Sequence, residues 1–426
     1  MVMNLYDQCI FLILMSTLNA NPEPPAYVYP EQVHLSFGET PLQMVVTWTT
    51  FNFTSSLVEY GMGELSSISE GSASRFFDKN DTGRIWYIHR VTLDHLKPGY
   101  KYAYHCGSTQ GWSDLFFFTS RSIDVDWAPW LAIYGDLGSS NGQSIMRLQQ
   151  EVVRNTIDVV LHVGDFAYDL DSDSGRVGDA FMRQIEPIAA YVPYMTSVGN
   201  HEHAQNFSHY RARFTMPGHT DGMYYSYDVG RAHIVSLSTE VYYYGTKAEA
   251  AEQLRWLEAD LTTLNRRKTP WLIVLGHRPM YCAVKDRSDC NYASNPVREE
   301  LEFLLYKHGV DLAIWAHEHE YERMYPVYNY TVCNGSAEAP YKNPRAPVHL
   351  ITGSAGCVER HTPFRLKPPF VAINNGDYGY TKLRVLNSTH LYFEQISDDQ
   401  AGAVVDRVMI ESHKHGVGVF TCHQDN

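Results

Sequence analysis

The 426-residue sequence predicts an all-β domain followed by an α/β domain. Up to about residue 120 it consists of short β-rich runs separated by Gly, Pro, Asn and Asp. From residue 130 onward, apolar strand-like runs alternate with segments of helical periodicity. Because a chain of this length is long for one hydrophobic core, we expect two structural domains.

Residues 28–121 are expected to form a small antiparallel β-sandwich. Short runs of β-branched and aromatic residues between turn residues are typical of this architecture. The segment resembles a fibronectin type III-like domain and offers no catalytic constellation, so we expect it to act as a scaffold. The predicted strands are residues 44–50, 56–60, 85–93, 100–106 and 115–119.

The α/β part is expected to span residues 129–345, with a β-rich continuation at 346–410 and a tail at 411–426. Alternating strands and helices favour an α/β domain with packed sheets, which the continuation would complete. The predicted strands are residues 130–134, 158–163, 271–275, 310–315, 348–352, 380–385 and 390–396. The predicted helices are residues 143–154, 248–264 and 296–308.

Five short polar blocks in the α/β part each follow a run of apolar or β-branched residues. Loops that leave adjacent strand ends converge on one crevice in an open α/β sheet. A lone Gly-Asp after a strand is usually a turn, but five such blocks predict one site. The blocks are Gly135-Asp136-Leu137-Gly138, Gly164-Asp165-Phe166-Ala167-Tyr168, Gly199-Asn200-His201-Glu202, Val274-Leu275-Gly276-His277 and Ala316-His317-Glu318-His319.

These blocks contain seven potential metal ligands, enough to hold two ions side by side. Such a pair can attack a phosphate ester with a metal-bound hydroxide. The seven residues are Asp136, Asp165, Tyr168, Asn200, His277, His317 and His319.

The blocks resemble those of the metallophosphoesterase superfamily, whose catalytic domain has two packed mixed sheets flanked by helices. Tyr168, three residues after Asp165, is similar to the tyrosine that marks the purple acid phosphatase family. A β-domain before the catalytic domain resembles the large plant-type members, and the ending at residues 316–319 resembles their animal relatives. The resemblance covers about residues 28–410.

The resemblance implies two ion sites that share Asp165. One set would hold Fe(III), which prefers carboxylate and phenolate oxygen, and the other would hold Zn, Mn or ferrous iron. The ferric set is Asp136, Asp165, Tyr168 and His319. The divalent set is Asp165, Asn200, His277 and His317. The implied activity is hydrolysis of phosphate monoesters at acidic pH.

His201 matches a family histidine that contacts substrate, and it is the candidate catalytic acid for the leaving alkoxide. His203 is a second candidate or a satisfied surface residue. Plant members carry two adjacent histidines shortly after the ligand that corresponds to His277, but residues 278–287 contain no histidine. Arg278, Lys285 and Arg287 are candidate replacements, or else exposed structural charges.

Two further segments near the blocks allow two interpretations each. Residues 321–323, Tyr-Glu-Arg, could clamp the substrate or form a local ion pair and packing contact. Residues 353–356, Gly-Ser-Ala-Gly, could line the cleft or form a plain turn at a strand end.

The N-terminus and the cysteines favour a soluble glycoprotein of the secretory pathway, secreted or lysosomal. Residues 1–20 resemble a signal peptide with an apolar core at 9–15, and no later run is long enough to span a membrane. Removal of Cys9 leaves six cysteines, which suits three disulfides, with Cys282 and Cys290 as the best single pair. Candidate glycosylation sites are Asn52, Asn80, Asn206, Asn329, Asn334 and Asn387.

The net charge of −14 argues against a protein that binds a nucleic-acid backbone. The expected partners are small phosphorylated substrates, and the family resemblance adds an expected homodimer. Three alternatives stay open on sequence alone. They are a phosphodiesterase or nucleotide pyrophosphatase of the same superfamily, a non-catalytic secreted binding glycoprotein, and peroxide chemistry at the iron.

Overall fold

The computed structural model describes residues 26–79, 81–284, 290, 294–361, 363–364 and 367–422. The predicted signal peptide at 1–20, the sequon at Asn80 and the candidate contacts Lys285 and Arg287 lie outside these residues.

The N-terminal domain contains two antiparallel sheets, as the sequence predicted. One has the strand order β1-β2-β6-β5, and the other has the order β4-β3-β7-β8 with β9 paired to β7. Trp48 and Tyr104 from opposite sheets are fully buried in its core. The strands are β1 (Glu31–Phe37), β2 (Met44–Thr50), β3 (Leu57–Gly61), β4 (Ser67–Glu70), β5 (Ser72–Asp78), β6 (Asp81–Leu93), β7 (Lys101–Ser108), β8 (Gly111–Trp112) and β9 (Phe116–Thr119), preceded by the short helix η1 (Ala26–Val28).

The α/β domain begins with strands of a six-stranded mixed sheet of order β12-β11-β10-β22-β23-β24. Strands β10, β11 and β12 are parallel, whereas β22 to β24 add an antiparallel extension. Every residue of the three parallel strands is buried, which explains their nearly continuous apolar sequences. The strands are β10 (Leu131–Tyr134), β11 (Val159–Val163), β12 (Tyr194–Ser197), β22 (Gly379–Val385), β23 (His390–Ser397) and β24 (Ala403–Glu411).

A seven-stranded mixed sheet of order β13-β14-β15-β16-β20-β17-β21 forms the other half of this domain. Its centre, from β14 to β20, is parallel, and β13 and β17 run antiparallel to their neighbours. The strands are β13 (Tyr225–Val229), β14 (Ala232–Ser236), β15 (Trp271–Leu275), β16 (Leu312–Trp315), β17 (Tyr321–Met324), β20 (Val348–Thr352) and β21 (Val371–Asn375), with the separate hairpin β18 (Val327–Tyr328) and β19 (Thr331–Val332).

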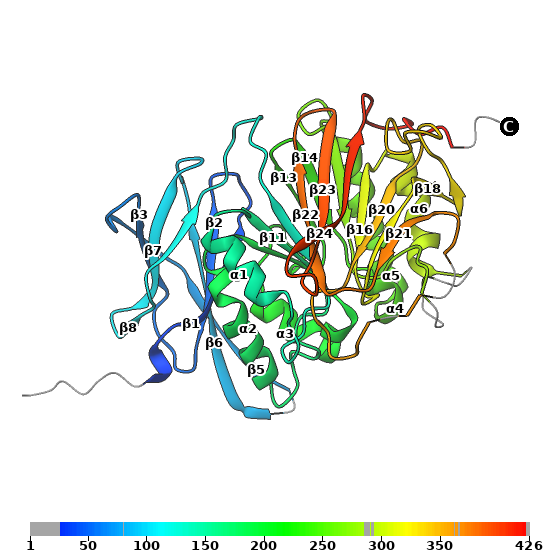
Figure 1. Cartoon of the computed structure of the whole chain (residues 1–426). Helices are drawn as coiled ribbons and strands as arrows, with labels where there is room; N and C mark the ends of the chain where they lie inside the picture. Colours follow the sequence, from blue (N-terminus) through cyan, green and yellow to red (C-terminus); the bar gives the residue numbers. More distant parts are fainter. Residues whose placement is uncertain are drawn as a thin grey trace, which may run out of the picture.

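Helices cover the two sheets from opposite sides. Helices α1 to α3 lie on the side of the N-terminal domain, and α4 to α6 lie on the far side (Figure 1). The predicted α/β architecture with two mixed sheets is therefore confirmed, although several of its elements were not predicted, among them α2, α3, α4, β13, β14, β17, β21 and β24. The helices are α1 (Ile145–Val153), α2 (Arg176–Ala189), η2 (Asn200–Glu202), α3 (Ala204–Arg213), α4 (Val241–Tyr244), α5 (Lys247–Thr263) and α6 (Pro296–Lys307).

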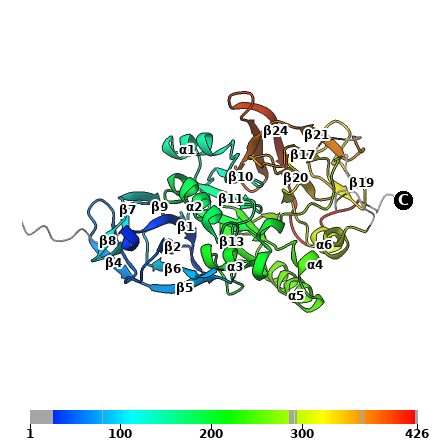
Figure 2. The same ribbon diagram turned by 90° about the horizontal axis from the view of Figure 1, so that it is seen from below.

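The two domains pack side by side (Figure 2) and share a buried polar network. Asp179 on α2 is 1% exposed and accepts hydrogen bonds from Arg84 and from the indole of Trp86, both on β6. It also accepts one from Arg213 Nη1 at 2.8 Å. One buried carboxylate therefore joins the β-domain to two segments of the α/β domain.

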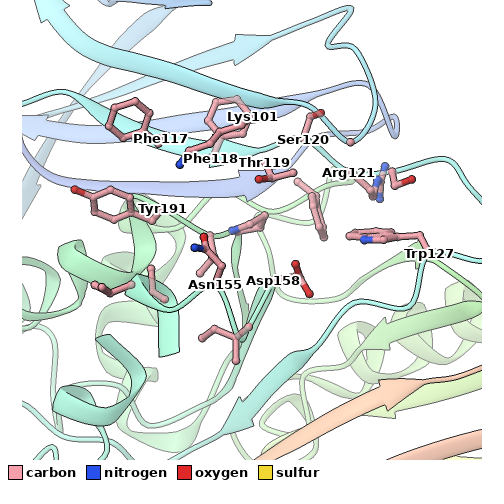
Figure 3. Close-up of a pocket in the computed structure, with 18 of the residues that line it drawn as sticks. Lys101, Phe117, Phe118, Thr119, Ser120, Arg121, Trp127, Asn155, Asp158 and Tyr191 are labelled. Atoms are coloured by element: carbon pink, nitrogen blue, oxygen red, sulfur yellow. The ribbon is translucent and has the colours of Figure 1, made fainter. Parts of the chain in front are cut away.

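A cavity of about 680 Å³ lies further along this junction. Phe117, Phe118 and Arg121 approach it from the N-terminal domain, and Asp158 and Tyr191 approach it from the α/β domain (Figure 3). The domains therefore meet through selected contacts that leave part of the junction unfilled.

The cysteines correct one expectation from the sequence. The predicted Cys282–Cys290 disulfide is present, and a second disulfide joins Cys333 to Cys422. Cys106 and Cys357 are free and buried, so the expected third disulfide is wrong. Their positions explain this result, because Cys106 belongs to β7 of the first domain and Cys357 to a loop of the second.

Surface features bear on the predicted secretory route. No helix among the described residues is long and apolar enough to cross a membrane. Of the five candidate glycosylation sites in this part of the chain, only Asn334 is half-buried. The exposed ones are Asn52, Asn206, Asn329 and Asn387.

Candidate metal centre

The five polar blocks converge on one place between the two sheets. Asp136, Asp165 and Asn200 follow strands β10, β11 and β12 of the six-stranded sheet, while His277 and His317 follow β15 and β16 of the seven-stranded sheet. All seven predicted ligand residues are brought together by this arrangement, as the contacts described below establish.

One group of side chains comprises Asp136, Tyr168 and His319. The phenolic Oη of Tyr168 lies 3.2 Å from Asp136 Oδ1 and 3.0 Å from His319 Nε2. His319 Nε2 is also 3.5 Å from Asp136 Oδ1. These oxygen and nitrogen atoms face one another, as ligands of one cation must.

A second group comprises Asp165, Asn200, His277 and His317. His277 Nε2 lies 3.1 Å from Asp165 Oδ2, 3.0 Å from Asn200 Oδ1 and 3.3 Å from His317 Nδ1. The groups adjoin, because the backbone N–H of His317 donates to Asp136 Oδ2 at 2.9 Å. The donor set of three imidazoles, two carboxylates, a phenol and an amide oxygen fits two adjacent cations.

Backbone carbonyls orient two of the histidines. His277 donates Nδ1–H to Val163 O at 2.9 Å, and His319 donates Nδ1–H to Arg360 O at 2.9 Å. A carbonyl can only accept, so in both residues the proton sits on Nδ1 and the lone pair of Nε2 points into the site. This pattern is usual for histidines that bind metal ions.

Glu202 holds two of the blocks together and was not predicted as a site residue. Its buried carboxylate accepts the backbone N–H groups of Gly199 at 2.9 Å and of Asp165 and Phe166 at 3.0 Å each. Asp165 in turn accepts the N–H of His201 at 3.0 Å. Glu202 follows Gly199 by three residues, the spacing at which a Glu can accept the N–H of the residue that begins a helix, and this spacing is the signal that could have identified it.

Backbone conformation at the site is unusual for residues with side chains. Four of the seven candidate ligands have left-handed φ values, namely Asp136 at 57°, Asp165 at 52°, Tyr168 at 56° and His317 at 69°. Residues other than glycine adopt this region rarely, and Asp is among those that tolerate it best. The chain therefore turns sharply at each of these four residues, and the turn points the side chain of that residue into the site.

The electrostatics of the cluster favour a cation. Burial and the carboxylates of Asp136 and Asp165 raise the pKa of Tyr168 well above its ordinary value. Burial opposes ionisation of Asp165, but His277 and His201 outweigh it and hold the pKa of Asp165 below its ordinary value. A phenol next to two carboxylates ionises only when a strongly acidic cation compensates the added charge.

His201 lies at the edge of the cluster and contacts a carboxylate. Its Nδ1 is 2.9 Å from Asp169 Oδ1, and its ring packs on Tyr168 with centroids 4.5 Å apart. Burial lowers the pKa of His201, but Asp165 and Asp169 outweigh it and raise the pKa overall. His203, in contrast, is exposed, donates Nδ1–H to Asn200 O and stacks on Tyr244.

The interpretation of Arg278 as an exposed charge is wrong. Arg278 is 7% exposed, its Nε lies 3.0 Å from both carboxylate oxygens of buried Glu240, and its guanidinium covers the ring of Tyr243. Its Nη1 lies 3.1 Å from His317 Nε2. A buried carboxylate partner is what keeps this cation inside, beside the second group of ligands.

The structure also decides between the two interpretations of residues 321–323 and of residues 353–356. Arg323 and Tyr321 both bind Asp406, each with a contact of 2.7 Å, so residues 321–323 make structural contacts, but the ion pair joins a distant strand and is not the local pair that was expected. Gly353 faces the centre, because a Cβ at this position would lie 2.7 Å from Asp136 Oδ2. The loop at 353–356 therefore lines the site, and glycine permits the close approach.

Three family models match the chain in succession. They are the purple acid phosphatase N-terminal domain at residues 30–120, the calcineurin-like phosphoesterase domain at 129–321, and the iron/zinc purple acid phosphatase-like C-terminal domain at 346–407. The chain is 52% identical to acid phosphatase type 7 of Danio rerio, with 92% of this chain and 93% of the relative covered. It is 50% identical to acid phosphatase type 7 of Homo sapiens, with 95% and 96% covered.

A solved structure agrees with these matches. The purple acid phosphatase isolated from yellow lupin (Lupinus luteus) seeds superposes with a TM-score of 0.79 at 26% identity, covering 90% of this chain and 74% of that one. The chain belongs to the purple acid phosphatase family. The fold, the block order and the β-domain of this purple acid phosphatase thus follow the expectation drawn from its sequence.

Two further residues beside the centre of this purple acid phosphatase escaped sequence reasoning. Asp169 follows Tyr168 directly, has a left-handed backbone with φ 74°, and contacts His201. Cys357 is counted among the cysteines but lies against His319. No local sequence pattern predicts either contact, because each contact joins segments that are far apart in the chain.

Proposed function

We infer that this member of the family is an acid phosphatase that hydrolyses phosphate monoesters at a binuclear centre. Asp136, Asp165, Tyr168 and His319 would hold Fe(III). Asp165, Asn200, His277 and His317 would hold a divalent ion, with Asp165 shared. The observation that carries the proposal is the convergence of these side chains from two sheets, with Tyr168 between Asp136 and His319. When bound, the two ions would supply an activated water and positive charge for the phosphoryl group.

The residues of the chain would then bind, orient and protonate the substrate. The phosphate would approach on the side of His317, which Arg278 holds in place through a contact of 3.1 Å between Nη1 and His317 Nε2. His201, held by Asp169 through Nδ1, presents Nε2 to the leaving oxygen and delivers the proton that an alkoxide needs. Gly353 keeps the opposite wall close to Asp136.

The visible absorption spectrum tests the assignment. Protein purified from a eukaryotic secretion host without added metal should show a broad violet band from a ferric phenolate, and Tyr168→Phe should abolish it. A colourless protein with full metal occupancy would contradict the ferric site. Hydrolysis of a phosphomonoester should be faster than that of a bis-ester, and the reverse order would favour a phosphodiesterase.

We further infer that the protein is a secreted glycoprotein. Its disulfides and its exposed sequons support this route, since disulfides persist in oxidising compartments. Expression in secreting cells, followed by enzymatic removal of N-glycans, tests it through a shift in apparent mass. Sedimentation of the same protein tests the expected homodimer, which a monomer at micromolar concentration would contradict.

A further inference from the structure

A free thiol lies beside the candidate ferric site. Cys357 is 1% exposed, and its Sγ lies 3.3 Å from Nδ1 and 3.5 Å from Nε2 of His319. No step of the proposed hydrolysis uses this sulfur. Thiolate is a soft ligand, which differs in kind from the carboxylate and phenol of the ferric set.

The loop that carries Cys357 is fixed by hydrogen bonds. The N–H of Cys357 donates to Leu137 O at 3.1 Å, and Asn141 Nδ2 donates to the carbonyl of Cys357 at 2.9 Å. The N–H of Glu359 points at the sulfur at 3.2 Å. The thiol is therefore held against His319 by its own backbone and by the loop after β10.

A third donor completes a set around the sulfur. One ligand atom each of His319, Cys357 and Glu359 lie within 4.8 Å of one another. Glu359 is exposed, so the set is open to solvent on that side. A thiolate, an imidazole and a carboxylate together form a ligand set that suits zinc and other thiophilic divalent ions, with a coordination position left for water.

We propose that His319, Cys357 and Glu359 form an alternative cation site that takes thiophilic divalent ions such as Zn²⁺ or Cd²⁺. On binding, the ion forms a bond with the sulfur, and the thiol proton passes to water. His319 is shared with the ferric set. Because its Nδ1 faces the carbonyl of Arg360, only Nε2 is available, and one nitrogen cannot serve both ions.

Thiophilic ions therefore compete with iron for His319. This competition rests on the proposed function, whereas the thiol site itself does not. Excess zinc or cadmium should displace the ferric ion, remove the violet band and inhibit hydrolysis. Iron-depleted protein should bind cadmium more tightly than iron-loaded protein, because iron then no longer occupies Nε2 of His319.

Cadmium supplies the test, because its bond to a thiolate absorbs in the ultraviolet independently of enzyme activity. The full-length protein is titrated with Cd²⁺ as purified, and again after the iron has been removed by reduction and chelation. We expect one equivalent to produce the thiolate band. Cys357→Ala should abolish the band, Cys106→Ala should leave it unchanged, and Glu359→Gln should weaken cadmium binding about tenfold or more.

The variants form a matched comparison, since Cys106 and Cys357 are both free and buried but only Cys357 lies against a histidine and a carboxylate. Absence of the band in the parent protein, or its persistence in Cys357→Ala, would overturn the proposal. A band at Cys357 in a protein without violet colour or phosphatase activity would instead remove the proposed function and leave the thiol site standing. Should Cys357→Ala fail to fold, the exposed variant Glu359→Gln decides, and unchanged cadmium affinity there rejects the site.

Discussion

The imidazole of His201 in the short helix η2 and the carboxylate of Asp169 in the loop after β11 meet, with Nδ1 and Oδ1 2.9 Å apart. This contact fixes the proton on Nδ1, while Nε2 lies 3.8 Å from Oε1 of the exposed Glu359. A histidine oriented in this way can protonate a leaving group, and a carboxylate partner stabilises its charged form.

Replacing His201 should therefore slow hydrolysis according to the leaving group. His201→Ala should lower kcat by roughly 10²- to 10⁴-fold for an alkyl phosphate but much less for p-nitrophenyl phosphate, whose leaving group needs no proton. Asp169→Asn should lower kcat by a smaller factor, with the same dependence on the leaving group. It should also narrow the pH range over which kcat is near its maximum. His203→Ala, which alters an exposed ring, is the control. Equal losses for both substrates would contradict the role of His201 as an acid.

Replacing Glu202 should loosen the centre without removing a ligand. Glu202→Gln leaves one oxygen for three backbone donors, so the loops that carry Asp165 and Asn200 lose their common anchor. Metal affinity should fall about 10- to 100-fold, measured as metal retained against a competing chelator. Glu249→Gln, which changes an exposed helix cap on α5, should keep its metal. Full retention in Glu202→Gln would show that the anchor is dispensable.

The junction between the domains should depend on Asp179. Asp179→Ala leaves Arg213 buried without its carboxylate, and breaking a buried pair in this way costs about 3–5 kcal/mol. The free energy of unfolding, measured by urea denaturation, should fall by that amount. Asp126→Ala breaks an exposed pair with Arg231 and should cost no more than about 1 kcal/mol. Similar effects of both changes would contradict the proposed importance of this network.

Stability should also depend on His233 between neutral and alkaline pH. Burial opposes protonation of His233, but Asp228 and Asp260 outweigh it and raise its pKa from 6.5 to about 9, while Lys268 also pairs with Asp228. The stabilisation is therefore complete below pH 6.5 and is lost as the pH rises through about 9. Its size is on the order of 3 kcal/mol.

The measurement is urea denaturation of the parent protein and of His233→Gln at pH 6 and pH 9.5. The difference in unfolding free energy between the two proteins should be large at the lower pH and small at the higher one. A difference that stays constant with pH would show that His233 contributes through packing alone.

Much of the secondary structure was predicted from the periodicity of apolar residues and from the turn residues at strand ends. Strand β15 was predicted to the residue, and α6 to within one, because both are flanked by clear turn residues. Helix α2 was missed although Phe181, Met182, Ile185 and Ile188 have helical spacing, since Gly178 and Pro187 interrupt the pattern. Strand β24 was missed because its exposed face carries polar residues such as Arg407.

Only the part of the site that residue types indicate, namely the metal ligands, could be predicted from the sequence. Seven competent ligands after strand-like runs were visible in the sequence, and the structure brings them together. The contacts of Glu202, Asp169 and Cys357 depend on how separate loops meet, which one-dimensional patterns do not encode. The state of Arg278 also depends on Glu240, 38 residues away, so its burial was not accessible from sequence.

The left-handed backbone at Asp136 and Asp165 restricts how the metal preference of this enzyme can change. A Glu or Cys at either position would alter the donor atom and also meet a conformation that those residues adopt with difficulty. Replacing either aspartate alone is thus unfavourable for two reasons, the changed donor atom and the backbone conformation. Natural variation and protein engineering should therefore shift the choice of ion through the neighbouring loops, such as residues 353–360, while the two aspartates stay in place.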